Sequence, residues 1–173
     1  MSQLLVGDVL RYNKKRRFGL VPRLIRLIQG NDCVHVAIVI RGGDFPEVAE
    51  ADSDFGVRVT PYEIACFKEV PKVSRINNIT IDERKLYENA IIYAAGSYAF
   101  EKILDACINH AFGRLYNLFG RDYTFREFTS KNNSSRFVCS TLVSRLLSNA
   151  SDQEYNPCAE PDDFTNGPWT LME

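Results

Sequence analysis

His35 and Cys139 are the two residues whose types and surroundings could support chemistry together. His35 lies inside the apolar run 34–40, which predicts a buried strand carrying one imidazole. Cys139 lies in the segment 134–143, which predicts the opening turn of a helix with Ser134 or Ser135 as its N-cap. A thiol attacks a carbonyl as the thiolate, and a helix N-terminus and a neighbouring imidazolium both favour that form. A cysteine hydrolase is therefore expected if the fold brings the two together.

Glu50 is the predicted partner of His35. The pair Gly42-Gly43 separates two apolar segments and predicts a tight hairpin. Centring the turn on these glycines places Glu50 directly opposite His35 on the same face, with about 5 Å between the Cβ atoms. Glu47 falls on the other face. A three-residue loop would shift the register by one and turn Glu50 away.

We expect a different role for each of the three residues. Glu50 would accept a hydrogen bond from one ring nitrogen, and His35 would take the thiol proton and later return it to the leaving group. Cys139 would carry the acyl intermediate, with the oxyanion near its own backbone N–H. The hydroxyls of Tyr12 and Tyr98 are candidates for a second donor or a substrate contact.

Each candidate also has an ordinary structural explanation. Cys139 shares a helical stripe with Leu142 and Val143, and cysteine is among the most buried residue types. A single histidine in an apolar strand is often a hydrogen-bonded core residue. The other histidine, His110, lies near Cys107 within a predicted helix, and this alternative pair lacks both free backbone donors and a carboxylate.

Length and charge limit the partners. The chain has 173 residues, of which 45% are apolar, and this predicts a single domain over 1–173. The formal net charge of −1 gives no general attraction to nucleic acid. One segment is locally basic, and it predicts either a solvated helix face or a contact with a membrane surface or an anionic substrate. Its charged residues are Lys14, Lys15, Arg16, Arg17, Arg23 and Arg26.

The cysteines and the N-terminal segment suggest a cytoplasmic protein. The five cysteines form no CxxC pair, so neither a disulfide framework nor a thiolate zinc site is expected, and no cofactor is predicted. Neither a signal peptide nor a membrane-spanning run is recognised, although a phage or viral origin stays open.

The remaining pattern predicts an α+β fold, in which a small antiparallel sheet has helices packed on one side. Strands are expected at 4–13, 34–40, 45–51, 57–60 and 66–70. Helices are expected at 24–29, 82–95 and 100–119 and after Cys139. The segment 120–133 is expected to be a polar loop, which could cover a cleft, and the tail is expected to be an ordered loop.

Several short segments stand in an order that matches a known family. They are Val6-Gly7-Asp8-Val9-Leu10, Leu24 to Gly30, Val34-His35-Val36-Ala37-Ile38, Ala49-Glu50-Ala51, Thr60 to Ile64, Gly96-Ser97-Tyr98, Phe137 to Val143 and Pro161-Asp162-Asp163-Phe164. In this order the chain resembles the permuted papain-like cysteine hydrolases of the NlpC/P60 superfamily, in the branch of the YiiX-like and YebB-like proteins. The histidine precedes the cysteine, as in the permuted arrangement.

The resemblance implies a fold and a chemistry. It implies Cys139 as nucleophile, His35 as base and Glu50 as the polar third member, with a small sheet or barrel packed on the helix that carries the cysteine. Members of this superfamily are associated with hydrolysis of amide bonds in peptidoglycan-type peptides and with thiol-mediated acyl transfer on lipids. The expected function is therefore a cysteine amidase or peptidase. The alternatives are a lipid acyltransferase or esterase with the same triad, and a catalytically silent binding module.

Overall fold

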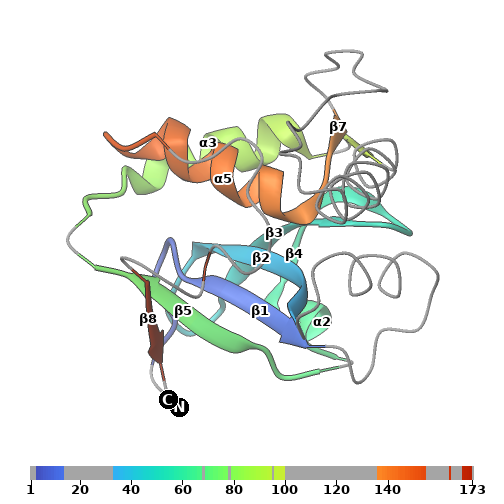
Figure 1. Cartoon of the computed structure of the whole chain (residues 1–173), viewed down its shortest axis with the longest axis horizontal. Helices are drawn as coiled ribbons and strands as arrows, with labels where there is room; N and C mark the ends of the chain where they lie inside the picture. Colours follow the sequence, from blue (N-terminus) through green and yellow to red (C-terminus); the bar gives the residue numbers. More distant parts are fainter. Residues whose placement is uncertain are drawn as a thin grey trace, which may run out of the picture.

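The computed structural model describes residues 3–13, 33–67, 69–77, 79–94, 96–99, 136–154, 164 and 169–172. The protein is α+β, with a six-stranded antiparallel sheet in the order β4-β3-β2-β1-β5-β8 and a separate parallel pair, β6 and β7 (Figure 1). The strands are β1 (Val9–Asn13), β2 (Cys33–Arg41), β3 (Glu47–Asp52), β4 (Gly56–Pro61), β5 (Lys72–Ile76), β6 (Ser97–Tyr98), β7 (Arg136–Phe137) and β8 (Trp169–Met172). The helices are α2 (Tyr62–Ala65), α3 (Glu83–Tyr93) and α5 (Cys139–Ala150).

Strand β2 lies inside the sheet and is buried on both faces. Val36 and Ile38 belong to the apolar cluster that includes α5, whereas Ala37 and Val39 belong to a second cluster with Tyr12 on the other face. Successive side chains of a strand point to opposite faces, so a strand covered on both sides reads as a continuous apolar run. The run around His35 is apolar for this reason.

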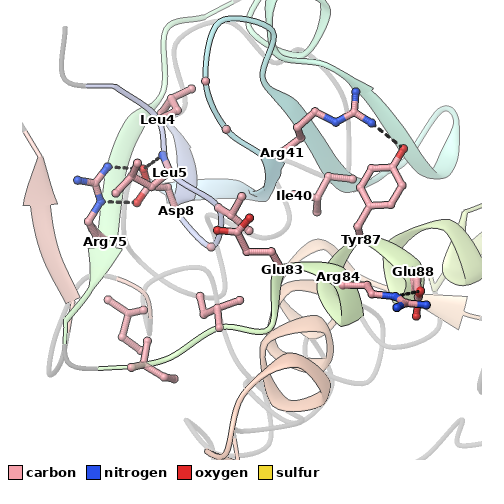
Figure 2. A pocket seen from close by; sticks show the side chains of 17 residues that line it. Leu4, Leu5, Asp8, Ile40, Arg41, Arg75, Glu83, Arg84, Tyr87 and Glu88 are labelled. Atoms are coloured by element: carbon pink, nitrogen blue, oxygen red, sulfur yellow. Dashed lines mark hydrogen bonds and ion pairs between the residues drawn. The ribbon is translucent and has the colours of Figure 1, made fainter.

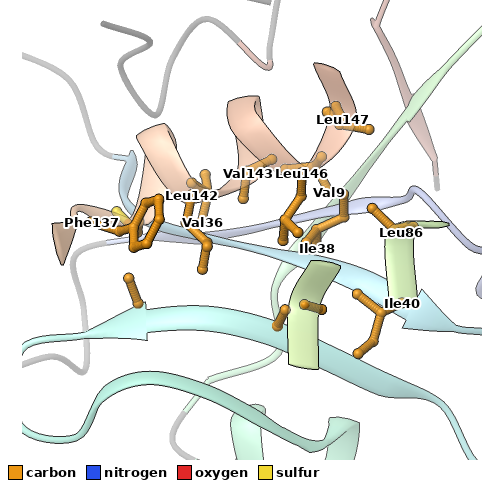
Figure 3. Packing of buried hydrophobic residues seen from close by; sticks show 14 of the residues in the cluster. Val9, Val36, Ile38, Ile40, Leu86, Phe137, Leu142, Val143, Leu146 and Leu147 are labelled. Atoms are coloured by element: carbon orange, nitrogen blue, oxygen red, sulfur yellow. The ribbon is translucent and has the colours of Figure 1, made fainter. Parts of the chain in front are cut away.

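Helices α3 and α5 lie together on one face of the sheet (Figure 1). In α5, Leu142, Val143, Leu146 and Leu147 are fully buried, and their helical spacing lines one side of the helix against β2 (Figure 3). Asp82 caps α3, because its carboxylate accepts a hydrogen bond of 3.0 Å from the backbone N–H of Lys85. The capped helix predicted at 82–95 is therefore confirmed.

The structure corrects three predicted elements. Strand β1 begins at Val9, because the residues before it form a turn in which the N–H of Asp8 donates to the carbonyl of Leu5. The strand predicted at 66–70 is wrong: the N–H groups of Cys66, Phe67 and Glu69 donate to carbonyls only three or four residues earlier, which continues the turn of α2. The tail contains strand β8, which pairs with β5 through four residue pairs and extends the sheet.

Some predictions lie outside the described residues. They concern the helices at 24–29 and 100–119, the basic segment, the His110 and Cys107 pair, and the polar loop at 120–133. Among the helices that the structure describes, none is both long enough and apolar enough to cross a membrane.

Candidate active site

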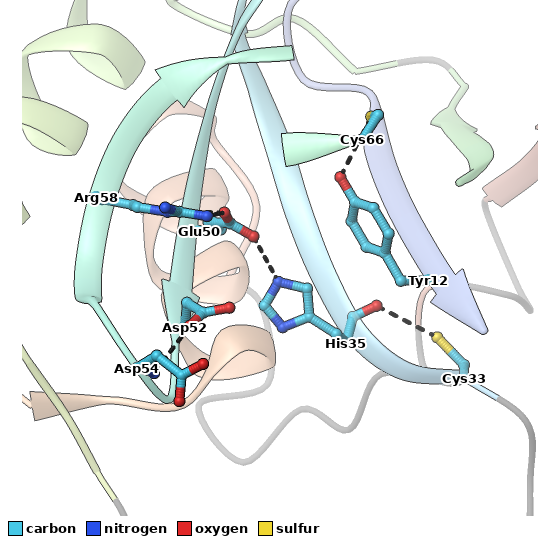
Figure 4. A network of polar contacts seen from close by, with 8 residues as sticks. All are labelled: Tyr12, Cys33, His35, Glu50, Asp52, Asp54, Arg58 and Cys66. Atoms are coloured by element: carbon cyan, nitrogen blue, oxygen red, sulfur yellow. Dashed lines mark hydrogen bonds and ion pairs between the residues drawn. The ribbon is translucent and has the colours of Figure 1, made fainter. Parts of the chain in front are cut away.

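His35 and Glu50 form a buried hydrogen-bonded pair. The imidazole Nε2 of His35 lies 2.7 Å from the carboxylate Oε2 of Glu50 (Figure 4). His35 is 4% exposed and Glu50 is fully buried. The predicted hydrogen bond between these two side chains is confirmed. Their catalytic roles stay predictions.

The register of the hairpin differs from the predicted one. Glu50 is opposite Ala37, so the predicted direct pairing with His35 is wrong. The ladder is irregular between Val39 and Arg41, and Arg41 pairs with Glu47, so the turn is longer than the two glycines suggest. The shift at Glu50 amounts to two positions, and a shift by two keeps each side chain on its face. Glu50 therefore reaches His35 along a diagonal.

Arg58 completes the polar group from the third strand. It is directly opposite Glu50 in the β3–β4 ladder, and its Nε and Nη2 donate to Oε1 of Glu50 at 2.9 and 2.6 Å. The guanidinium carbon lies 4.5 Å from the ring centre of Phe55. Sequence reasoning missed Arg58. Counting outward from the turn before Gly56 would have paired it with Glu50.

Tyr12 packs against the imidazole from β1. It pairs with His35 in the β1–β2 ladder, and the two ring centres are 5.4 Å apart with a tilt of 50°. Tyr12 is 1% exposed, and its hydroxyl lies 3.6 Å from Sγ of Cys66. The structure thus places Tyr12 beside the candidate base. Its predicted substrate contact stays a prediction.

Tyr98 is far from Tyr12 in the chain, and its predicted substrate contact stays a prediction. It belongs to β6 and pairs with Phe137 of β7 in a parallel register. The N–H of Ala99 also donates to the carbonyl of Phe137 at 2.9 Å. The backbone at Tyr98 is therefore fixed beside the segment that leads into Cys139.

Cys139 is the first residue of α5. The N-cap is Val138, so the predicted cap at Ser134 or Ser135 is wrong. The helix starts later because the side chain of Thr141 caps the first turn. The hydroxyl of Thr141 accepts a hydrogen bond of 3.2 Å from the N–H of Val138 and donates one of 3.1 Å to the carbonyl of the same residue. Cys139 therefore occupies the N-terminal turn, where backbone N–H groups have no partner within the helix.

Helix α5 packs on the two strands that carry His35 and Glu50. Among the described residues, the pairing of β2 with β3 ends at Ala37 and Glu50, so His35 lies beyond the last pair. Figure 4 shows its imidazole between the ribbons of β2 and β3. Cys139 is 2% exposed and belongs to the apolar cluster of Val36 and Ala51, which face α5. His35 and Glu50 leave their strands on the other face, the one that carries Tyr12. Contact between its thiol and the imidazole stays a prediction.

The geometry of the imidazole determines which nitrogen could serve the thiol. Nε2 of His35 faces the carboxylate of Glu50, so a proton from Cys139 would have to reach Nδ1. The carboxylate holds the ring in one orientation and favours the tautomer with hydrogen on Nε2. In that tautomer, Nδ1 has the lone pair that a general base needs.

A second thiol, Cys66, lies near the same group. Burial raises the pKa of Cys66. Hydrogen bonds with Tyr12 and Tyr62 lower this pKa by a smaller amount, so the pKa stays above its ordinary value. Burial likewise raises the pKa of Tyr62 to about 12, and its hydrogen bond with Cys66 adds to this. Cys66 is therefore held as the neutral thiol, which makes it a poor nucleophile.

An open pocket of about 950 Å³ lies at the other end of β2 (Figure 2). Its lining includes Ile40 and Arg41 at the end of β2, whereas His35 lies at the start of that strand. One wall contains the ion pair of Arg75 and Asp8, with nitrogen–oxygen distances of 2.7 Å. The pocket is thus separate from the candidate active site.

No protein-family model matches this chain, and no curated protein is significantly similar to it in sequence.

Proposed function

We propose that the protein is a cysteine hydrolase that cleaves an amide bond, in a peptide or a peptidoglycan-type peptide, through Cys139, His35 and Glu50. The observation that carries the proposal is the buried hydrogen bond of 2.7 Å between His35 and Glu50. A histidine oriented by a carboxylate is the activating half of a cysteine nucleophile. The thiol is expected from Cys139 at the N-terminus of α5. Because α5 covers the face of Val36 and Ala51, the imidazole would reach the thiol past the end of the β2–β3 pairing, where His35 lies.

The reaction would proceed in two stages. The thiol of Cys139 gives its proton to Nδ1 of His35, and the sulfur attacks the carbonyl carbon of the amide. The carbon–nitrogen bond breaks, the amine leaves with the proton from His35, and the acyl group stays on sulfur as a thioester. Water then loses a proton to His35 and attacks the thioester, which releases the acid and restores the thiol.

Backbone N–H groups in the first turn of α5 would stabilise the negative oxygen of each tetrahedral intermediate. Glu50 would stabilise the imidazolium that forms in each stage. Because it is fully buried, little water would screen this interaction.

Alkylation with iodoacetamide, followed by mass spectrometry, tests the activated thiol. The reagent is small, which suits a cysteine that is 2% exposed. We expect Cys139 to react fastest of the five cysteines, and we expect this advantage to fall at least about tenfold in His35→Ala. The matched control is His110→Ala, which removes the other histidine and should leave the order of reactivity unchanged.

Equal reactivity of the cysteines in the native protein would overturn the proposal, and so would an advantage that survives His35→Ala. The substrate class is then tested by incubating the protein with a mixture of peptides and phospholipids. We expect peptide products that disappear in Cys139→Ser. A lipid product would instead identify an acyltransferase or esterase.

A further inference from the structure

We propose that Arg58 is a positioning residue that keeps the His35 and Glu50 pair free of an extra proton, so that the imidazole is available as a base at neutral pH. This inference rests on the proposed function, because it assigns Arg58 a part in preparing the same base. The two carboxylate oxygens of Glu50 have different partners. Oε1 receives both hydrogen bonds from Arg58, and Oε2 faces His35.

The charges explain why such a residue is needed. The carboxylate of Glu50 is fully buried, and a buried negative charge requires a positive partner. Two partners are within reach, namely a protonated His35 and Arg58. A guanidinium stays charged at any ordinary pH, so Arg58 can neutralise the carboxylate without a proton on the imidazole. The pair can then contain a carboxylate and a neutral base.

The fold holds the guanidinium in place from two directions. Arg58 is paired directly with Glu50 in the β3–β4 ladder, so the two side chains leave neighbouring strands on the same face. The ring of Phe55 lies on the guanidinium with a separation of 4.5 Å. The side chain of Arg58 is 28% exposed, so its outer part can stay hydrated while its inner nitrogens bind the carboxylate.

The other polar groups near the imidazole are distributed over several elements. Tyr12 and Cys66 lie on the side of β1 and α2, and Cys33 donates to the carbonyl of His35 from β2 itself. Asp52 lies two residues beyond Glu50 in β3. Its carboxylate accepts a hydrogen bond of 2.8 Å from the backbone N–H of Asp54. Cys139 begins the helix that packs on β2 and β3. Among the groups named in this paragraph, together with His35, Glu50 and Arg58, only Arg58 carries a permanent positive charge.

The test is the proton uptake of the pair, followed by NMR of the histidine ring protons. The chain has two histidines, so His110→Gln assigns both signals. In Arg58→Met we expect the midpoint of the His35 titration to move upward by roughly one pH unit, because the carboxylate then needs a proton on the pair. This direction holds whichever of the two side chains carries the proton.

Two further variants separate charge from structure. Arg58→Lys keeps the positive charge and loses the fork, so its midpoint should lie between those of the native protein and Arg58→Met. The matched control is Arg41→Met, which removes the more exposed ion pair with Glu47 at 3.3 Å and should leave the midpoint unchanged. If Arg58→Met fails to fold, the upward shift in Arg58→Lys decides the question.

The outcomes are distinct for the two proposals. An unchanged midpoint in both Arg58 variants overturns the role of Arg58, even if Cys139 remains the most reactive thiol. An upward shift supports that role. If the native Cys139 shows no advantage that depends on His35, the hydrolase fails while the shift still reports what Arg58 does to the pair.

Discussion

Glu50 is paired with Ala37 across the β2–β3 ladder, and its carboxylate reaches His35 two residues away along β2. A diagonal neighbour on an antiparallel sheet lies farther away than a direct one, and a long side chain can span this distance. The methyl group of Ala37 fills little of the space along the diagonal. The small residue at position 37 and the length of the glutamate together permit the hydrogen bond.

Replacing Glu50 by Gln tests the contribution of the carboxylate charge. The amide has nearly the same shape but lacks the negative charge that stabilises an imidazolium, so we expect alkylation of Cys139 at neutral pH to slow at least about tenfold. Glu47→Gln is the matched control, because this residue lies on the same strand with its side chain on the other face. Equal rates in the two variants would contradict the role of Glu50.

Cys66 provides an internal reference for the reactivity measurements. Because burial raises its pKa above the ordinary value of 9.0, its alkylation at neutral pH should be slow and should still be increasing with pH at 9.0. The hydrogen bond with Tyr12 lowers this pKa, so Tyr12→Phe should slow the alkylation of Cys66 further. Rates measured by mass spectrometry across this pH range check both expectations. A plateau below pH 8 would contradict them.

Gly56 begins the strand that carries Arg58, and the backbone there requires glycine. Its φ is +73°, and an added Cβ would lie 2.6 Å from the carbonyl oxygen of Gly96. We expect Gly56→Ala to lower the free energy of unfolding by about 2 kcal/mol in urea denaturation. Gly43→Ala is the control, since its φ is +87° but an added Cβ has no neighbour within 4 Å. Its cost should be clearly smaller, and equal costs would show that the contact with Gly96 does not matter.

The ion pair of Arg75 and Asp8 should stabilise the fold near the end of β2 that is away from His35. Asp8 is 1% exposed, and both of its oxygens accept from the guanidinium. We expect Arg75→Met to lower the free energy of unfolding by about 3 kcal/mol, because it leaves a buried carboxylate without its cation. Arg84→Met removes an exposed pair with Glu88 and should leave the free energy of unfolding nearly unchanged, because solvent screens this pair. A small effect at Arg75 would contradict the buried-pair argument.

Part of the fold could be predicted from the sequence, because apolar periodicity reflects burial. The run around His35, the alternation at 57–60 and the stripe after Cys139 correspond to β2, β4 and α5. Strand β8 was missed because its pairing with β5 is a contact between distant segments, and local pattern does not reveal it.

The candidate site could also be predicted only in part from the sequence. The shared face of His35 and Glu50 follows from the period of two along each strand, and it tolerated an error of two positions in the register. The irregularity near Arg41 shifted the ladder, and nothing in the residue types there distinguishes it from a tight turn. The partnership of Arg58 with Glu50 depends on the register of the β3–β4 hairpin, in which Asp52 is opposite Gly56 and Glu50 is opposite Arg58. The N-cap of α5 was misplaced because Thr141 supports the first turn from inside the helix.

The polar group formed by His35, Glu50 and Arg58 comes from three consecutive strands, whereas Cys139 comes from a helix much later in the chain. During synthesis, His35, Glu50 and Arg58 would all leave the ribosome long before Cys139 does. Contacts between adjacent hairpins form early and contacts between distant segments form late. The nascent protein would therefore form the candidate proton relay before the candidate nucleophile is in place, so that under the proposed function reactivity at the sulfur would report the packing of α5 on the sheet.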